Sequence, residues 1–95
     1  MSSLIKLYTQ NDCPYCVLMK KKLTEWGYGY LEINVSENLE AKRFLKENGH
    51  RTVPQLYANN MHLNENVDTA AFQKRHLEIA LSLSYENDGG VEMFG

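Results

Sequence analysis

Cys13 and Cys16 are the residues of this 95-residue chain whose type and spacing best suit covalent chemistry. Pro14 and Tyr15 separate them, and a polar stretch ending at Asp12 precedes them. In a cytosolic protein, two cysteines three positions apart indicate redox or metal chemistry rather than a disulfide scaffold. The spacing therefore predicts a reactive thiol pair.

The cysteines are expected at the start of a helix over residues 14–26. Pro14 suits the first helical position, apolar residues then recur at helical spacing, and Gly27 is a natural stop. A helix amino terminus stabilises a thiolate, so the pKa of Cys13 should fall from about 8.5 into the range of about 3.5–7.5. Cys13 is the expected nucleophile, and Cys16, one turn deeper, the expected resolving thiol.

The rest of the chain alternates apolar runs with helical patterns in the order βαβαββα. Strands separated by helices imply a parallel pair, and a closing hairpin with an Asn59-Asn60 turn adds antiparallel strands. This order predicts an α/β fold with a four-stranded mixed sheet flanked by helices, in a thioredoxin-like outline. Asp68 is a good N-cap for the last helix. Strands are expected over residues 4–8, 28–35, 53–58 and 61–63, and helices over residues 14–26, 36–45 and 68–83.

Length and charge exclude several classes of protein. The length predicts one domain over residues 1–84, and the polar, Gly-containing residues 85–95 are expected to form a disordered or loosely docked tail. The net charge of −2 gives no footprint for nucleic acid or for an anionic membrane. No signal segment and no run of about 20 apolar residues is present. We expect a cytosolic protein and, by default, a monomer.

Zinc binding and structural burial are the alternative interpretations of the cysteine pair. A zinc site needs about four ligands with paired spacings, but His50, His62 and His76 are scattered singly. Each histidine is therefore expected to be a surface or packing residue, and no metal site is predicted. A structural pair would rarely span a loop-to-helix junction with Pro and Tyr between its members.

Two motifs carry a resemblance to the dithiol glutaredoxins. Residues 12–16 read Asp-Cys-Pro-Tyr-Cys and residues 52–55 read Thr-Val-Pro-Gln. The similarity in element order extends from about Leu4 to about Leu83, and the short chain is similar to compact bacterial or phage-like members. The resemblance implies a cis peptide bond before Pro54 that faces the cysteines, glutathione as co-substrate, and no bound cofactor.

The resemblance also implies a glutathione site. The Val53 backbone would pair with the cysteinyl backbone of glutathione as an added strand, with Pro54 keeping that edge free. Tyr15 would flank the ligand. Amide donors at Val67 and Asp68, at the start of the last helix, would receive the γ-glutamyl end. The residues assigned to glutathione are Gln10, Tyr15, Arg51, Thr52, Val53, Pro54, Val67 and Asp68.

The chain departs from the family pattern at two places. Glutaredoxins commonly have a lysine three residues before the first cysteine and a Gly-Gly pair before the last helix, where this chain has Gln10 and Asn64-Glu65. Losing the lysine removes a cation that helps the thiolate and the glutathione glycyl carboxylate. Weaker glutathione binding is therefore a hypothesis. Basic residues that could compensate are Arg51, Lys42 and Arg43, with Arg51 favoured.

The leading functional prediction is an enzyme that uses glutathione to reduce protein disulfides and glutathione mixed disulfides, with ribonucleotide reductase a plausible recipient by family analogy. Glutaredoxin potentials of about −200 to −230 mV are near the cytosolic glutathione poise. One alternative is an electron donor reduced by a thioredoxin reductase, which the two departures keep open. The other is a dimeric iron–sulfur cluster carrier, although such members usually have a small residue where this chain has Pro14.

Overall fold

The computed structural model describes residues 4–65 and 67–82, which form a four-stranded sheet with helices on both faces. The strand order is β2-β1-β3-β4, with β1 parallel to β2 and antiparallel to β3, and β4 antiparallel to β3. The predicted mixed sheet is thus confirmed. The strands are β1 (Ile5–Thr9), β2 (Leu31–Asn34), β3 (Gln55–Ala58) and β4 (Met61–His62).

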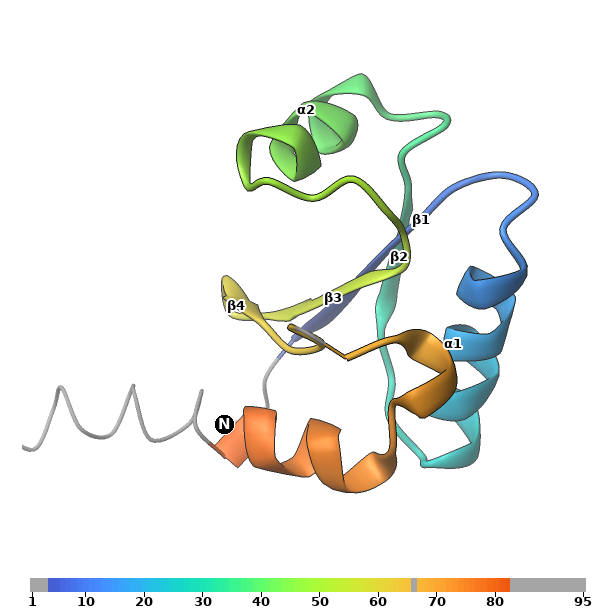
Figure 1. The fold of residues 1–95 in the computed structure, drawn as a ribbon, viewed down its shortest axis with the longest axis vertical. Helices are drawn as coiled ribbons and strands as arrows, with labels where there is room; N and C mark the ends of the chain where they lie inside the picture. Colours follow the sequence, from blue (N-terminus) through green and yellow to red (C-terminus); the bar gives the residue numbers. More distant parts are fainter. Residues whose placement is uncertain (1–3, 66, 83–95) are drawn as a thin grey trace, which may run out of the picture.

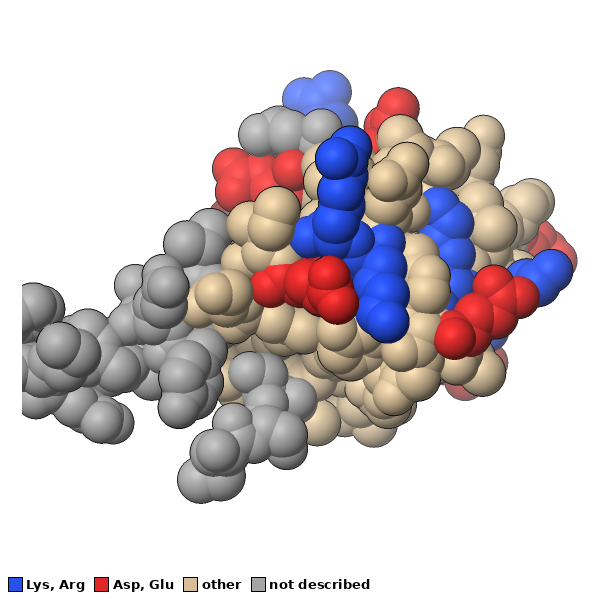
Figure 2. Space-filling view, turned by 90° about the horizontal axis from the view of Figure 1, so that it is seen from below, with Lys and Arg blue, Asp and Glu red and all other residues tan. Residues whose placement is uncertain are grey.

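The helices are α1 (Pro14–Glu25), α2 (Leu39–Glu47), a single 3₁₀ turn η1 (Thr69–Ala71) and a last helix described over residues 74–82. Figure 1 shows α2 on one side of the sheet and α1, with the orange last helix, on the other. On the face in Figure 2, the described Lys and Arg residues are interspersed with Asp and Glu. No helix within the described ranges is long and apolar enough to cross a membrane.

Alternation along β1 explains why the sheet has a core on each face. Successive side chains of a strand point to opposite faces, so Leu7 faces α1 and the last helix while Tyr8 faces α2. Tyr8 stacks on Phe44 of α2 at a ring-centroid distance of 5.4 Å. The buried residues on the α1 face are Ile5, Leu7, Met19, Leu23, Leu56, Ala58, Leu63, Phe72 and Leu77.

Local signals place α1 where the sequence predicts it, whereas α2 begins at Leu39 rather than at residue 36. Gly27, with a φ of 85°, follows α1, and Gly49, with a φ of 79°, follows α2. Glycine adopts this left-handed conformation without the cost that a Cβ imposes. The Asn38 side chain caps α2 by accepting a hydrogen bond from the Ala41 N–H at 3.0 Å. The helix then continues two residues beyond the expected end at residue 45.

The hairpin turn agrees with the prediction, whereas the bounds of β2 and β3 differ from it. The predicted turn is confirmed, since Asn59 and Asn60 have φ values of 51° and 70°, as a type I′ hairpin requires. However, β2 covers four residues rather than residues 28–35, because the residues before it pack against the core without pairing. The third strand begins at Gln55 rather than at residue 53, because Pro54 has no N–H to donate to a neighbouring strand.

The prediction that Asp68 caps the last helix is wrong. Asp68 precedes η1, and its side chain makes no capping hydrogen bond. The last helix begins at residue 74, and the Gln73 N–H donates to Nδ1 of His76 at 2.9 Å. His76 thus replaces the acidic residue of a capping box. The end of the predicted helix at Leu83 and the predicted tail at residues 85–95 lie outside the described residues.

Candidate active site

Cys13 occupies the N-cap of α1, as predicted. Its backbone is extended, with φ −119° and ψ 97°, and Pro14 takes the first turn of the helix. The Cys13 Sγ accepts a hydrogen bond from the Cys16 N–H at 3.1 Å. A sulfur in this position lies where the unpaired N–H groups of the helix converge. The local geometry therefore favours negative charge on Cys13.

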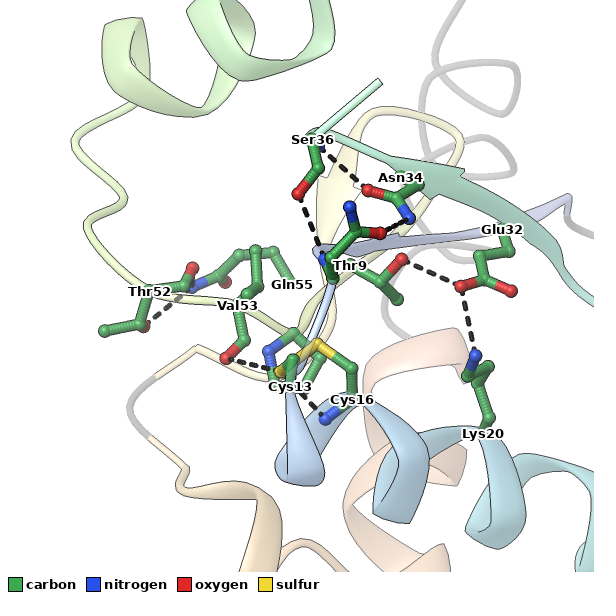
Figure 3. The surroundings of a disulfide bond; sticks show 12 residues. Thr9, Cys13, Cys16, Lys20, Glu32, Asn34, Ser36, Thr52, Val53 and Gln55 are labelled. Carbon is green, nitrogen blue, oxygen red and sulfur yellow. Dashed lines mark hydrogen bonds and ion pairs between the residues drawn. A yellow bond between two sulfur atoms is a disulfide. The ribbon is translucent and has the colours of Figure 1, made fainter. Parts of the chain in front are cut away.

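The two cysteines form a disulfide, with their Cα atoms 5.2 Å apart (Figure 3). Cys16 is only 2% exposed, whereas Cys13 is partly exposed. An incoming thiol or disulfide therefore reaches Cys13 first, and Cys16 lies behind it. This arrangement suits a nucleophile and a resolving thiol, although the assignment of those roles stays a prediction.

The loop before Cys13 is fixed to the end of β2. The Asn11 N–H donates to Ser36 Oγ at 3.0 Å, and the Asn34 side chain donates to Asn11 Oδ1 at 2.9 Å. Figure 3 shows Asn34 and Ser36 above the disulfide in that view. Asp12, with a φ of 55°, turns the chain from this loop into α1. The parallel pairing of β1 and β2 thus helps to set the position of the cysteine pair.

Val53 faces the cysteine pair from the opposite loop. The predicted cis peptide bond between Val53 and Pro54 is confirmed. The Val53 carbonyl oxygen lies 3.9 Å from Cys13 Sγ. Among the described residues, no acceptor is found for the Val53 N–H. The backbone beside the reactive sulfur therefore keeps a donor available for a ligand.

Hydrogen bonds made by the side chains of Gln55 and His62 support this loop. Gln55 is 8% exposed and donates through Nε2 to the Thr52 carbonyl at 3.0 Å. Its Oε1 lies 2.6 Å from His62 Nε2. Because the Gln55 oxygen only accepts, His62 carries the proton on Nε2 in this bond. Gln55 and His62 thereby fix the peptide group just before Val53.

An open groove of about 1090 Å³ runs alongside this loop. One wall is formed by the residues before β3 and the other by the segment that enters η1. Seven of the eight residues predicted to bind glutathione line it, and these are Tyr15, Arg51, Thr52, Val53, Pro54, Val67 and Asp68. The prediction that Val67 and Asp68 start the last helix is wrong, but both lie in the groove because the chain passes there before η1.

Gln10, the eighth predicted residue, lies elsewhere. It lines a second depression of about 570 Å³, together with both cysteines, Lys20 and Glu32. Cys13 therefore lies between the depression, which it lines, and the groove, which is lined by the neighbouring Val53. The structure does not bring Gln10 together with the other seven residues.

Asn64, at one position of the family Gly-Gly pair, has a structural function that sequence reasoning missed. It is 7% exposed, and its Oδ1 accepts from the Leu56 N–H at 3.0 Å. Its Nδ2 donates to the Pro54 carbonyl at 3.2 Å. Because β4 is only two residues long, the Asn64 carboxamide supplies hydrogen bonds that a longer strand would make. Glu65, the second residue of the pair, is exposed and lines the groove.

The prediction that the histidines are scattered singly is wrong for His50 and His62. The rings of His50 and His62 lie 4.6 Å apart at the groove, and His50 Nε2 lies 2.6 Å from the Tyr57 hydroxyl. Burial, and then the neighbouring His50, lower the pKa of His62. The hairpin brings these residues together although they are distant in sequence. Within the described ranges, no group of three or more His, Cys, Asp or Glu residues is arranged to hold a metal ion.

A second network that the sequence did not reveal lies in the depression near Cys16 (Figure 3). The Thr9 hydroxyl donates to Glu32 Oε2 at 2.8 Å, and Lys20 Nζ lies 3.1 Å from the same oxygen. The Thr9 hydrogen bond, followed by that of Lys20, lowers the pKa of Glu32. The charged residue inside the predicted strand over residues 28–35 was the available signal.

Comparison with known proteins identifies the family. The glutaredoxin family model matches residues 5–63, which is more than half of the chain. The chain belongs to the glutaredoxin family. Its helix-capping Cys13 and buried Cys16 are thus the redox-active pair of a glutaredoxin of the thioredoxin superfamily, as the motifs predicted.

Individual glutaredoxins show how far the likeness extends. Glutaredoxin 1 of Rickettsia conorii is 42% identical over 62 residues, which cover 62% of this chain and 61% of that protein. The chain thus spans less than two thirds of that relative. Glutaredoxin 3 of Escherichia coli is 33% identical over 73 residues, which cover 75% of this chain and 87% of that protein.

The solved structure of a glutaredoxin-like protein with a thioredoxin-like activity profile is also similar to this chain. The glutaredoxin-like NrdH-redoxin of Escherichia coli, described as having a thioredoxin-like activity profile, is 33% identical and superposes with a TM-score of 0.58. The alignment covers 61% of this chain and 76% of that one. The thioredoxin-like fold is therefore confirmed.

Proposed function

We propose that this glutaredoxin is a cytosolic, glutathione-dependent thiol–disulfide oxidoreductase that reduces protein disulfides and glutathione mixed disulfides. The observation that carries the proposal is the groove beside Cys13, where the Val53 N–H has no acceptor among the described residues. A short peptide lying in this groove can pair with Val53 as an added strand. Its cysteinyl sulfur then comes close to Cys13, because Cys13 Sγ is 3.9 Å from the Val53 oxygen.

The two ends of glutathione would meet different groups. Tyr15, with 58% of its surface exposed, offers a ring against which the ligand can pack. Arg51 is an exposed cation in the groove and suits the glycyl carboxylate. Val67 and Asp68 lie in the other wall and would face the γ-glutamyl end.

The reaction that we propose begins with reduced Cys13. Its thiolate attacks the glutathione sulfur of a mixed disulfide, and the protein thiol leaves as a thiolate that takes up a proton. A second glutathione thiolate then attacks the glutathione sulfur of the Cys13–glutathione disulfide. This step releases glutathione disulfide and regenerates the Cys13 thiolate. Mixed disulfides thus require only Cys13.

Protein disulfides require both cysteines. Cys13 attacks one sulfur of the substrate, and the Cys16 thiolate then attacks Cys13 in the mixed disulfide. The substrate leaves with both sulfurs reduced, and the chain is left with the Cys13–Cys16 disulfide present in this structure. Two molecules of glutathione restore the dithiol and become glutathione disulfide. By analogy with the family, we include ribonucleotide reductase among the recipients.

A second candidate function is electron transfer from a thioredoxin reductase. Two observations favour it: Gln10 does not line the groove, and Glu65 places a negative charge beside a site for an anionic ligand. The likeness to NrdH-redoxin, a protein with a thioredoxin-like activity profile, points the same way. Both candidates use the same cysteine pair and differ in the reductant.

The test compares the two reductants on the same protein. Reduction of a glutathione mixed disulfide is followed with glutathione and glutathione reductase, and insulin disulfide reduction with thioredoxin reductase. We expect turnover with glutathione that disappears in Cys13→Ser and persists in Cys16→Ser. Activity with thioredoxin reductase alone would overturn the glutathione proposal and favour the second candidate.

A further inference from the structure

The second wall of the groove, residues 67–71, is a short segment with few hydrogen bonds of its own. The Ala71 N–H donates to the Asp68 carbonyl at 3.0 Å. The Phe72 N–H donates to the Thr69 carbonyl at 3.2 Å. No strand of the described sheet pairs with this segment. A one-turn helix of this kind needs an external anchor to keep a fixed orientation.

Lys22, near the end of α1, provides such an anchor. Its Nζ lies 2.6 Å from the Thr69 carbonyl oxygen and 2.6 Å from that of Phe72. The Ala70 carbonyl oxygen is 3.4 Å away. An ammonium group has three N–H donors and no acceptor, so one side chain serves all three carbonyls. These hydrogen bonds are charge-assisted and therefore stronger than those between neutral groups.

We propose that Lys22 is a positioning residue that fixes the second wall of the groove and so sets the affinity for the γ-glutamyl end of glutathione. The inference rests on the proposed glutathione-dependent function and adds a residue that lies outside the groove lining. Lys22 does not touch the ligand. It acts through the peptide groups of η1.

The orientation of one peptide group explains how this works. The N–H and C=O of a trans peptide unit lie in one plane and point in opposite directions. Since the Thr69 carbonyl points to Lys22, the Ala70 N–H of the same unit points away from α1. Ala70 lines the groove, and no acceptor for its N–H is found within the described ranges. Lys22 thereby presents an amide donor of the kind that binds a carboxylate.

Apolar packing alone does not fix this orientation. Phe72 is 1% exposed, and its ring centroid lies 6.0 Å from that of Trp26, so the end of the segment is anchored to α1 by contact. Such contact is non-directional and does not by itself orient the peptide group between Thr69 and Ala70. Helix α1 also carries Cys13 at its other end, about 13 Å away at 1.5 Å per residue. One rigid helix therefore links the reactive sulfur to the wall that receives the ligand.

The experiment compares Lys22→Met with Lys21→Met. Methionine keeps an unbranched side chain but removes the charge and the donors, and Lys21 is exposed on the same helix. Amide hydrogen exchange of Ala71 and Phe72 is measured in the unliganded proteins. The KM and kcat for a glutathione mixed disulfide are measured with glutathione reductase coupling, and the alkylation rate of Cys13 by iodoacetamide reports on the thiolate.

For Lys22→Met we expect faster exchange at both amides and a KM about tenfold higher, the change that loss of one charge-assisted contact produces. The kcat and the alkylation rate should stay within about twofold, since Cys13 is not disturbed. Lys21→Met should match the native chain. An unchanged KM in Lys22→Met, whether or not exchange increases, would overturn the proposal, as would an equal rise in both variants.

The two proposals fail in different ways. If the native chain does not turn over with glutathione, the proposed function fails, whatever the variants do. The exchange of Ala71 and Phe72 then decides whether Lys22 orders the segment, because that measurement needs no ligand. Unchanged exchange in Lys22→Met would reject the positioning as well.

Discussion

The two walls of the groove are held in different ways. The wall that carries Val53 rests on buried neutral side chains, since Gln55 bonds to Thr52 and Asn64 to the backbone of β3. The wall at residues 67–71 belongs to no strand, and one ammonium group and the packing of Phe72 tie it to α1. The first wall is therefore part of the folded core, and the second is attached to it.

Because of this difference, we expect substitutions at the two walls to affect different quantities, the stability of the fold and the affinity for the ligand. Removing a buried hydrogen-bonding side chain leaves its partner groups unsatisfied where water cannot replace the lost bond. This lowers the free energy of unfolding of the whole fold. A partly exposed ion contact contributes less to folding, because solvent competes for the same groups. We expect substitutions below the Val53 wall to change the free energy of unfolding, and those at the other wall to change ligand binding first.

Asn64→Ala should have the largest effect. It leaves the buried Leu56 N–H and Pro54 carbonyl without their side-chain partner, at about 1–3 kcal/mol for each group. We expect the free energy of unfolding to fall by about 2–4 kcal/mol in urea titrations. Glu65→Ala, at the exposed neighbouring position, should change it by less than about 0.5 kcal/mol. Equal, small effects of the two substitutions would mean that the Asn64 bonds do not support the wall.

Acidification should weaken the same wall through His62. Its pKa is lowered in the folded chain by burial and then by His50, so the unfolded chain takes up a proton first. The stability that neutral His62 provides is complete above the unfolded pKa of about 6.5 and is lost as the pH falls from there toward the folded pKa. We expect the free energy of unfolding to decrease over this window, by less than in Asn64→Ala because His62 is only partly buried.

His62→Gln serves as the control for this pH dependence. Glutamine keeps an N–H donor for Gln55 but does not titrate. The difference between the native and variant profiles isolates His62 from the other histidines. Parallel profiles from pH 8 to pH 5 would show that His62 contributes no linkage.

Glu65→Gln should have the smallest effect and should appear in binding alone. Glu65 is exposed in the groove, where its charge opposes an anionic ligand. We expect the KM for a glutathione mixed disulfide to fall about twofold at low salt, and the gain to vanish at about 1 M salt through screening. Glu47→Gln, on an exposed position of α2, is the matched control. A gain that persists at high salt would point to a cause other than charge.

The sequence sufficed for the features that local chemistry determines. Pro14 after Cys13 placed the cysteine pair at a helix start, and Gly27 marked the end of that helix, where the backbone has a positive φ. These signals act within a few residues of the chain and are therefore visible in spacing alone. The cis bond before Pro54 was implied instead by the resemblance of the Thr-Val-Pro-Gln motif to the glutaredoxins, and it is confirmed.

The missed features depend on contacts between distant segments. Asn64 and Lys22 bind backbone groups of other elements, and no spacing rule links a side chain to such a partner. Asp68 resembled an N-cap because an apolar helical pattern follows it. The structure instead inserts η1, so His76 closes the true helix start at Gln73. Pairing in the hairpin likewise brought His62 to His50, which the sequence separates.

The most direct test is the structure of Cys16→Ser trapped as the Cys13–glutathione mixed disulfide. We predict that the glutathione cysteinyl backbone pairs with Val53 in the groove and that the γ-glutamyl carboxylate meets the Ala70 N–H. The Val53 amide should then be protected from hydrogen exchange. Glutathione lying instead in the depression beside Gln10 and Lys20, with Val53 unprotected, would contradict the account.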